Sequence, residues 1–281
     1  MQFLNKRNIK RIIRIGCLIV LIFPLSGCDE DAEQRLPERN WELIWSDDFN
    51  GAKGASPDAS KWNYDIGKGT DGWGNQELQY YTDRPENVML DGKGNLVITA
   101  KKENYSGSSY TSGRIKTQGL FAQKYGKIES RIKTPSGPGI WPAFWMLGDN
   151  INTTPWPACG EVDIMELKGH TPNVVHSTLH GPGYSAGSAL TKSYGLQNSR
   201  FDQGYHIFGM EWKENQIDFF VDGYLYHREK STDTSKDWVF NHSFFLIMNI
   251  AVGGNFVGFP TDSTLFPQQM YIDYIRVYKA K

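Results

Sequence analysis

The chain is poor in cysteine, with three in 281 residues: Cys17, Cys28 and Cys159. The first two belong to an N-terminal targeting segment, so Cys159 would be the one cysteine with a free thiol in the mature protein. A disulfide framework within the mature chain is therefore excluded. Cys159 directly precedes an acidic segment, and we interpret it as a small buried packing residue rather than a nucleophile.

A long apolar run is also missing. The apolar stretch at 15–25 is shorter than the roughly 20 residues that span a bilayer. Residues 25–28 read Leu-Ser-Gly-Cys and resemble the lipobox of bacterial lipoproteins. We predict a lipoprotein signal peptide at 1–27, acylation of Cys28 and an acidic tether at 28–40. The product would be a secreted lipoprotein, membrane-anchored in the periplasm or at the cell surface, with the outer membrane expected. The alternative is an ordinary secretory signal with a chance cysteine.

Basic charge is not in excess either. The full chain has 30 basic and 31 acidic residues, and residues 1–27 hold five of the basic ones and no acid. The mature chain would then have 25 basic against 31 acidic residues, a net charge of −6. This balance argues against nucleic acid as a partner. We expect a monomer whose membrane contact is made through the N-terminal lipid.

No window carries a sustained 3.6-residue apolar period, so helices should be short and few. The length, the 14% aromatic content and the 29 glycines favour one large all-β domain. Short β-branched or aromatic segments are predicted as strands at 41–45, 95–101, 126–134, 174–180, 205–212, 216–221, 224–228, 244–251 and 270–279. Longer segments are predicted as loops at 67–87, 104–113, 135–139, 150–158, 181–200 and 253–269.

Three carboxylates stand within six residues of an apolar, β-prone run: Glu161, Asp163 and Glu166. On a regular strand Glu161 and Asp163 share a face and Glu166 does not, because side chains alternate. One extra residue, a β-bulge near Met165, would bring all three to one side. The plain alternative is a solvated polar face on an edge strand. Packing like charges this closely is costly, which favours a functional site.

Aromatic residues are common in or beside the predicted loops, among them Trp73, Trp141 and Trp156. Each one taken singly is better explained as a core residue. As a set that flanks an acidic strand, they indicate a carbohydrate groove, because sugar C–H faces stack on aromatic rings.

Five motifs now resemble those of glycoside hydrolase family 16, in the bulged form of laminarinases. They lie at 75–84, 139–146, 160–166, 177–184 and 248–254. The similarity runs from about residue 41 to residue 278. It implies an all-β, concanavalin A-like jelly-roll sandwich of two curved antiparallel sheets with a substrate cleft on the concave face. Residues 41–281 would form the catalytic domain.

The resemblance implies retaining hydrolysis, with Glu161 as nucleophile, Glu166 as general acid/base and Asp163 hydrogen-bonded to the nucleophile. Retention needs two carboxyl groups about 5–5.5 Å apart. Strand spacing alone would separate the two glutamate Cα atoms by more than about 10 Å, so their convergence rests on the resemblance.

The resemblance also implies substrate contacts and a metal. The substrate residues would be Trp156 and Trp141 for stacking, Asn75 and Arg84 for glycone hydroxyls, His180 near the cleavage point, and Trp145 and Asn249 behind them. A structural calcium remote from catalysis would use Asp273 and backbone oxygens near Asp48 and Gly92. Asp273 is equally well explained as a plain exposed acid. Catalysis itself would need no cofactor.

We therefore expect an endo-acting hydrolase of β-1,3-glucan of the laminarin type, with mixed 1,3/1,4-glucan as a further substrate. One alternative is a related hydrolase of agar, carrageenan or porphyran. Another is a non-catalytic β-glucan-binding lipoprotein, although such proteins typically lack one or both catalytic glutamates, and Glu161 and Glu166 are both present.

Overall fold

The computed structural model describes residue 36 and residues 39–281. The predicted signal peptide, the acylated Cys28 and nearly all of the predicted tether lie outside the described residues. Within the described part, no helix is long and apolar enough to cross a membrane.

The described chain folds into two large sheets, and its helices are single short turns. The first sheet has ten strands in the order β15-β14-β13-β8-β17-β5-β6-β3, with β1 on β17 and β4 on β5. Their bounds are β1 Trp41–Asp47, β3 Gln79–Tyr81, β4 Val88–Leu90, β5 Leu96–Tyr105, β6 Ser108–Ser112, β8 Gly126–Lys133, β13 His206–Lys213, β14 Gln216–Val221, β15 Tyr224–Lys230 and β17 Gln268–Ala280.

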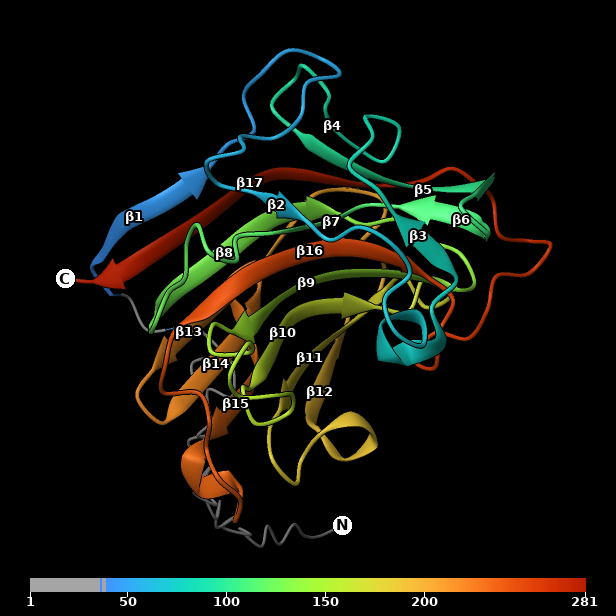
Figure 1. Cartoon of the computed structure of the whole chain (residues 1–281). Coiled ribbons are helices and arrows are strands. Elements are labelled where there is room, and N and C mark those ends of the chain that lie inside the picture. The colour runs from blue at the N-terminus through green and yellow to red at the C-terminus, as the bar shows by residue number, and fades with distance from the viewer. Residues whose placement is uncertain (1–35, 37–38) are drawn as a thin grey trace, which may run out of the picture.

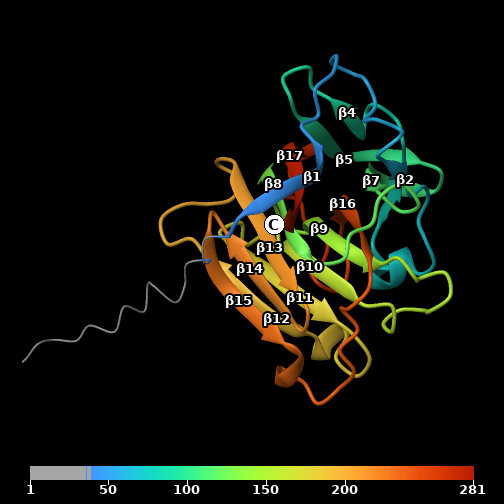
Figure 2. The same cartoon turned by 90° about the vertical axis from the view of Figure 1, so that its left-hand side faces the viewer.

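The second sheet has seven strands in the order β12-β11-β10-β9-β16-β7-β2. Their bounds are β2 Asn63–Tyr64, β7 Arg114–Lys116, β9 Ile140–Gly148, β10 Glu161–Leu167, β11 Val174–His180, β12 Leu190–Gly195 and β16 Phe244–Val252. The helical turns are η1 Gly72–Gln76, η2 Ala186–Ser188 and η3 Ser231–Asp233. Figure 1 shows the curvature of the strands, and Figure 2 shows the two sheets layered against each other. The predicted all-β sandwich is confirmed.

The core lies between the sheets because each sheet turns its apolar alternate residues inward. In β9, Phe144 and Met146 are fully buried, and β10 adds Val162 from the next strand. The central strand β16 is buried along its whole length, since β9 and β7 flank it on both edges. Cys159 is free and buried, as predicted for a packing residue.

Some predicted loops contain strands. The segment predicted as a loop at 67–87 contains β3, and those at 104–113 and 181–200 contain β6 and β12. β3 pairs with β6 in parallel, so the first sheet is not purely antiparallel. These strands are short or weakly alternating, and their pairing comes from tertiary contacts rather than from local pattern.

The first and last strands are neighbours. β1 pairs antiparallel with β17, and Trp41 lies opposite Ala280. The backbone N–H of Lys281 donates to the carbonyl of Asn40 over 3.1 Å. The described chain therefore enters and leaves the sandwich at one place.

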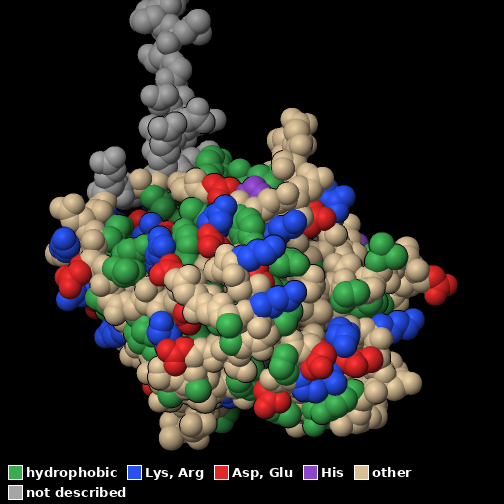
Figure 3. Space-filling view, turned by 90° about the horizontal axis from the view of Figure 1, so that it is seen from above, with side chains coloured by type: hydrophobic (Ala, Val, Ile, Leu, Met, Phe, Trp, Pro, Cys, Tyr) green, Lys and Arg blue, Asp and Glu red, His purple; other side chains and the backbone are tan. Residues whose placement is uncertain are grey.

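The surface mixes charges of both signs. On the face drawn in Figure 3, Lys and Arg side chains lie interspersed with Asp and Glu side chains. This face carries no broad basic field of the kind that binds nucleic acid.

Candidate active site

The site is built on an irregularity in β10. Asp163 lies opposite Thr178 of β11, and Glu166 lies opposite His176, so three steps along β10 match two along β11. The same shift occurs against β9, where the partners are Trp145 and Ala143. One residue of β10 is therefore extra, and the β-bulge predicted near Met165 is confirmed.

The bulge decides which way the acids point. Ile164 and Met165 are adjacent in sequence, yet both belong to the buried core. Because two consecutive residues face inward there, Glu161, Asp163 and Glu166 all lie on the outer face of the seven-stranded sheet. Asp163 is 3% exposed and Glu166 is 9% exposed, so this face is well covered at the acids.

His180 of β11 completes the cluster. Its Nε2 lies 3.2 Å from Oδ2 of Asp163 and 3.7 Å from Oε1 of Glu161. Its Nδ1 accepts a hydrogen bond from the backbone N–H of Ala186 at 3.1 Å. The proton of a neutral imidazole must then be on Nε2, the nitrogen near the carboxyl groups. Oδ2 of Asp163 nevertheless makes no hydrogen bond, so His180 acts on the acids through its proximity.

Burial raises the pKa of all three acids. The pKa of Glu161 and that of Glu166 are each raised to about 8, first by burial and next by the nearby charge of Asp163. Burial raises the pKa of Asp163 to about 8 as well. His180 lowers the pKa of both glutamates in part, because electrostatic attraction to it favours their charged form.

Three acids this close cannot all be ionised at neutral pH, so they share protons and titrate as a unit. Asp163 is the least exposed of the three and is hydrogen-bonded to Glu161. The hydrogen bond with Glu161 lowers the Asp163 pKa in part, and it lets the two carboxyl groups share one proton. Glu166 accepts a hydrogen bond from the indole N–H of Trp141 at 3.0 Å. The arrangement can hold one carboxylate ready to attack and one carboxylic acid ready to donate a proton.

Comparison with known proteins agrees with this geometry. The sequence pattern of Glycosyl hydrolases family 16 matches residues 75–276. The chain belongs to this family. The beta-glucanase of Rhodothermus marinus is 42% identical over 282 residues, which cover 96% of this chain and 96% of that protein. The clotting factor G alpha subunit of Tachypleus tridentatus is 41% identical over 243 residues, 86% of this family 16 chain but only 34% of that protein.

A solved structure shares the fold of this family 16 chain. The catalytic domain of the endo-1,3-beta-glucanase (laminarinase) from Thermotoga petrophila RKU-1 superposes with a TM-score of 0.83 at 48% identity. The superposition covers 87% of this chain and 100% of that domain.

The structure places several predicted substrate residues of the family 16 chain around the acids. Trp156 is 43% exposed, and its ring centroid lies 6.0 Å from that of His180, at the Glu161 end of β10. Trp141 lies at the Glu166 end. The indole N–H of Trp145 donates to the side chain of Asn249 at 2.8 Å, and the strand register puts both residues on the same face as the acids. Their predicted place behind the substrate contacts stays a prediction.

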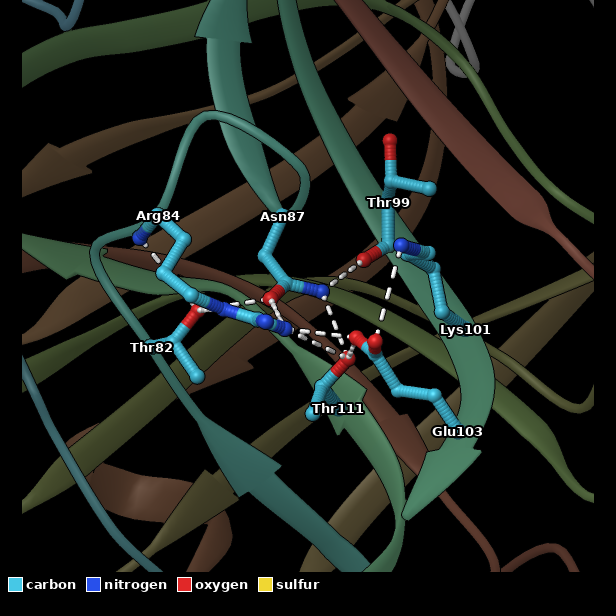
Figure 4. A network of polar contacts seen from close by, with 7 residues as sticks. All are labelled: Thr82, Arg84, Asn87, Thr99, Lys101, Glu103 and Thr111. Atoms are coloured by element: carbon cyan, nitrogen blue, oxygen red, sulfur yellow. Dashed lines mark hydrogen bonds and ion pairs between the residues drawn. The ribbon is translucent and has the colours of Figure 1, made fainter. Parts of the chain in front are cut away.

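Asn75 and Arg84 are placed differently. Asn75 lies in η1, and its amide is 3.5 Å from the carboxylate of Glu77. Arg84 belongs to a separate polar network around Asn87, Glu103 and Thr111 (Figure 4). Its guanidinium also stacks on Tyr105, 4.3 Å from the ring centre. In this structure Arg84 links the loop after β3 to Glu103 of β5, and its contact with a sugar stays a prediction.

Two residues near the site escaped the sequence reasoning. Glu77 is 8% exposed and accepts hydrogen bonds from Gln79 and Tyr81. Arg114 lies over both Trp73 and Trp145, at 4.4 and 4.8 Å from the ring centres. Glu77 stands inside the motif at 75–84 and could have been singled out there. Arg114 carries no local signal, since its site is made by aromatic rings from distant segments.

Metal ligands were tested in the same way. In the described part of the chain, the ligand atoms of Glu161, Asp163 and His180 lie within 4.8 Å of one another, close enough to hold a cation. A cation there would bind the carboxylate of Glu161, the predicted nucleophile. Of the predicted calcium ligands, Asp273 pairs with Arg131 at 2.6 Å and Asp48 pairs with Arg276 at 2.9 Å. The Asp273 carboxylate is thus neutralised by an arginine, while the predicted ligands near Asp48 and Gly92 are backbone oxygens, and calcium binding stays a prediction.

Proposed function

We propose that this family 16 chain is a retaining endo-hydrolase of β-1,3-glucan. The bulge that brings Glu161, Asp163 and Glu166 to one face is the observation that carries the proposal. The relatives support the substrate class, since one is named a beta-glucanase and another an endo-1,3-beta-glucanase (laminarinase). Mixed 1,3/1,4-glucan is a further proposed substrate.

In the first step, a carboxylate oxygen of Glu161 attacks the anomeric carbon of a glucosyl unit. The bond from that carbon to the glycosidic oxygen breaks, and the proton of Glu166 moves to the departing oxygen. The leaving chain is released as an alcohol, and a glucosyl ester of Glu161 remains. His180, whose Nε2 lies 3.7 Å from Oε1 of Glu161, stabilises the ionised Glu161 by electrostatic attraction before the attack.

In the second step, Glu166 is ionised and takes a proton from water. The water oxygen attacks the anomeric carbon, and the ester bond to Glu161 breaks. Two inversions give net retention of configuration. The hydrogen bond from Trp141 to Glu166 suits this step, because it favours the ionised form.

The test is release of reducing sugar from laminarin by the purified enzyme, with proton NMR of the first product to read its anomeric form. We expect oligosaccharides in the β form. Glu161→Ser should reduce turnover below detection while oligosaccharide binding stays measurable by calorimetry. No release by the wild type at micromolar enzyme would refute the proposal and favour glucan binding without catalysis. Parallel assays on lichenan, agarose and carrageenan distinguish the related hydrolases.

We also propose that Cys28 carries a lipid that anchors the enzyme to a membrane. The basic residues before 15–25 and the Leu-Ser-Gly-Cys sequence at 25–28 support this. Phase partitioning in Triton X-114 tests it on the full chain expressed in a Gram-negative host. Wild type should enter the detergent phase and Cys28→Ala the aqueous phase. Equal partitioning of the two would contradict the proposal.

A further inference from the structure

A short turn after β16 holds one aromatic residue over the acids. Gly253 and Gly254 have φ values of 73° and 123°, which side chains rarely adopt. The N–H of Gly258 donates to the carbonyl of Gly254 at 2.9 Å and closes the turn. The N–H of Asn255 donates to the carbonyl of Asn75, also at 2.9 Å. Phe256 stands at the centre of this anchored turn.

Phe256 contacts residues from two strands of the seven-stranded sheet and the residue that follows a third. Its ring centre lies 5.1 Å from that of Trp141 in β9 and 5.5 Å from that of His176 in β11. The ammonium of Lys168, directly after β10, lies 4.5 Å from the ring centre. The turn therefore lays Phe256 across the outer face.

These contacts surround Glu166. Trp141 donates to the Glu166 carboxyl group, and His176 lies directly opposite Glu166 in the sheet. Lys168 follows two residues later and shares its face. Phe256 thus packs against neighbours of Glu166 on both sides, and Glu166 itself is 9% exposed.

We propose that Phe256 is a positioning residue that keeps Glu166 protonated before the first step, by excluding water from it and by holding the Lys168 ammonium on the ring face. The proposal rests on the proposed role of Glu166 as general acid. An apolar wall favours the neutral form of a carboxyl group. An ammonium released from the ring could approach Glu166 and favour its charged form instead.

Other titratable groups also face Glu166. They are Asp163 and Glu161 on its own strand, His176 and His180 on β11, and Tyr226 on β15. β9 contributes Trp141, which does not titrate. Burial, and next the charge of Lys168, lower the pKa of His176, so this ring is neutral near pH 7. A substitution at Phe256 leaves the acids and His180 themselves in place, so it tests the surroundings of Glu166.

The test is the pH dependence of kcat/KM on laminarin for wild type and Phe256→Ala. The basic limb reports loss of the protonated acid. Losing the wall should move this limb to lower pH by about 0.5–1 unit, since water then reaches Glu166. Phe256→Tyr keeps the ring and should keep the wild-type limb. Leu265→Ala is the matched control, because Leu265 lies between β16 and β17 but is 76% exposed.

A second readout does not need activity. Carbon NMR titration of labelled full-length protein, with Glu166→Gln to identify the signal, should show a lower Glu166 pKa in Phe256→Ala. Lys168→Met alone should leave the limb in place, and in the Phe256→Ala background it should restore part of the shift. An unchanged limb with raised KM would overturn the proposal and make Phe256 a sugar contact. Inactive wild type would refute the proposed function instead, while the NMR titration would still decide this inference.

Discussion

The hydrogen bond from Trp141 to Glu166 offers a sharp test of the catalytic assignment. Replacing Trp141 by Phe keeps an aromatic ring but removes the N–H that donates to Glu166 at 3.0 Å. That bond favours the ionised carboxylate, so its loss must raise the Glu166 pKa. This is opposite in sign to the effect expected for Phe256→Ala.

The size of the shift follows from the strength of such bonds. A hydrogen bond to a charged group contributes about 1.5–3 kcal/mol, and one pKa unit corresponds to about 1.36 kcal/mol. Glu166 is 9% exposed, so water can replace part of the lost bond. We therefore expect a rise of about 1 unit. The wild-type basic limb should lie near the Glu166 pKa of about 8, and the variant's limb near pH 9.

The assay is kcat/KM on laminarin from pH 4 to pH 10, because its limbs report the pKa values of the free enzyme. A pH-independent loss of sugar stacking on Trp141 would lower the whole profile and leave the position of the limb unchanged. Trp145→Phe is the control, because the same strand carries it and its N–H donates to Asn249 rather than to an acid. The control limb should stay in place. A Trp141→Phe limb that stays or moves to lower pH would refute the assignment of Glu166 as the group seen in that limb.

Three further predictions concern stability. The pKa of Asp163 is raised in the folded protein, so the folded state loses stability as pH rises from the unfolded pKa to about 8. Asp163→Asn lacks this ionisation. Its Tm relative to wild type should therefore increase between pH 5 and pH 9 in calorimetric scans. Arg84→Met should lower Tm, because Glu103 and Asn87 each lose a partner, although Glu103 keeps Lys101 and Thr111. A raised KM for laminarin in this variant would confirm the predicted sugar contact, and an unchanged KM would limit Arg84 to a structural role. His227 links Ser177 to Glu229 in the core, at 2.7 and 2.9 Å, so His227→Leu should cost about 3–5 kcal/mol of folding free energy, read by urea unfolding, while the folded fraction keeps its kcat.

The acid cluster could be read from the sequence because its signal is local. The five-residue step from Glu161 to Glu166 has the wrong parity for a regular strand, and a bulge is the smallest correction. The strands at 216–221 and 224–228 can also be predicted from local sequence, since Asp222 and Gly223 make a two-residue turn between them.

Other features depend on contacts that no local pattern encodes. β12 at Leu190–Gly195 is half exposed and lies against β11, so its polar sequence reads as loop. Arg84 has the residue type of a sugar contact, but Glu103, from β5, turns it toward the protein. The cover over Glu166 needs Phe256 to return from a turn more than eighty residues away, which spacing along β10 cannot show.

The pairing of β1 with β17 has a consequence for how this domain combines with others. Because Asn40 and Lys281 are joined by a hydrogen bond, the sandwich could be inserted into a loop of another protein without separating the two ends of that loop. The relative from Tachypleus tridentatus, of which the matched region is 34%, has such a domain within a much longer chain. Modules joined at either end would extend from the ten-stranded sheet, whereas the acids lie on the seven-stranded sheet.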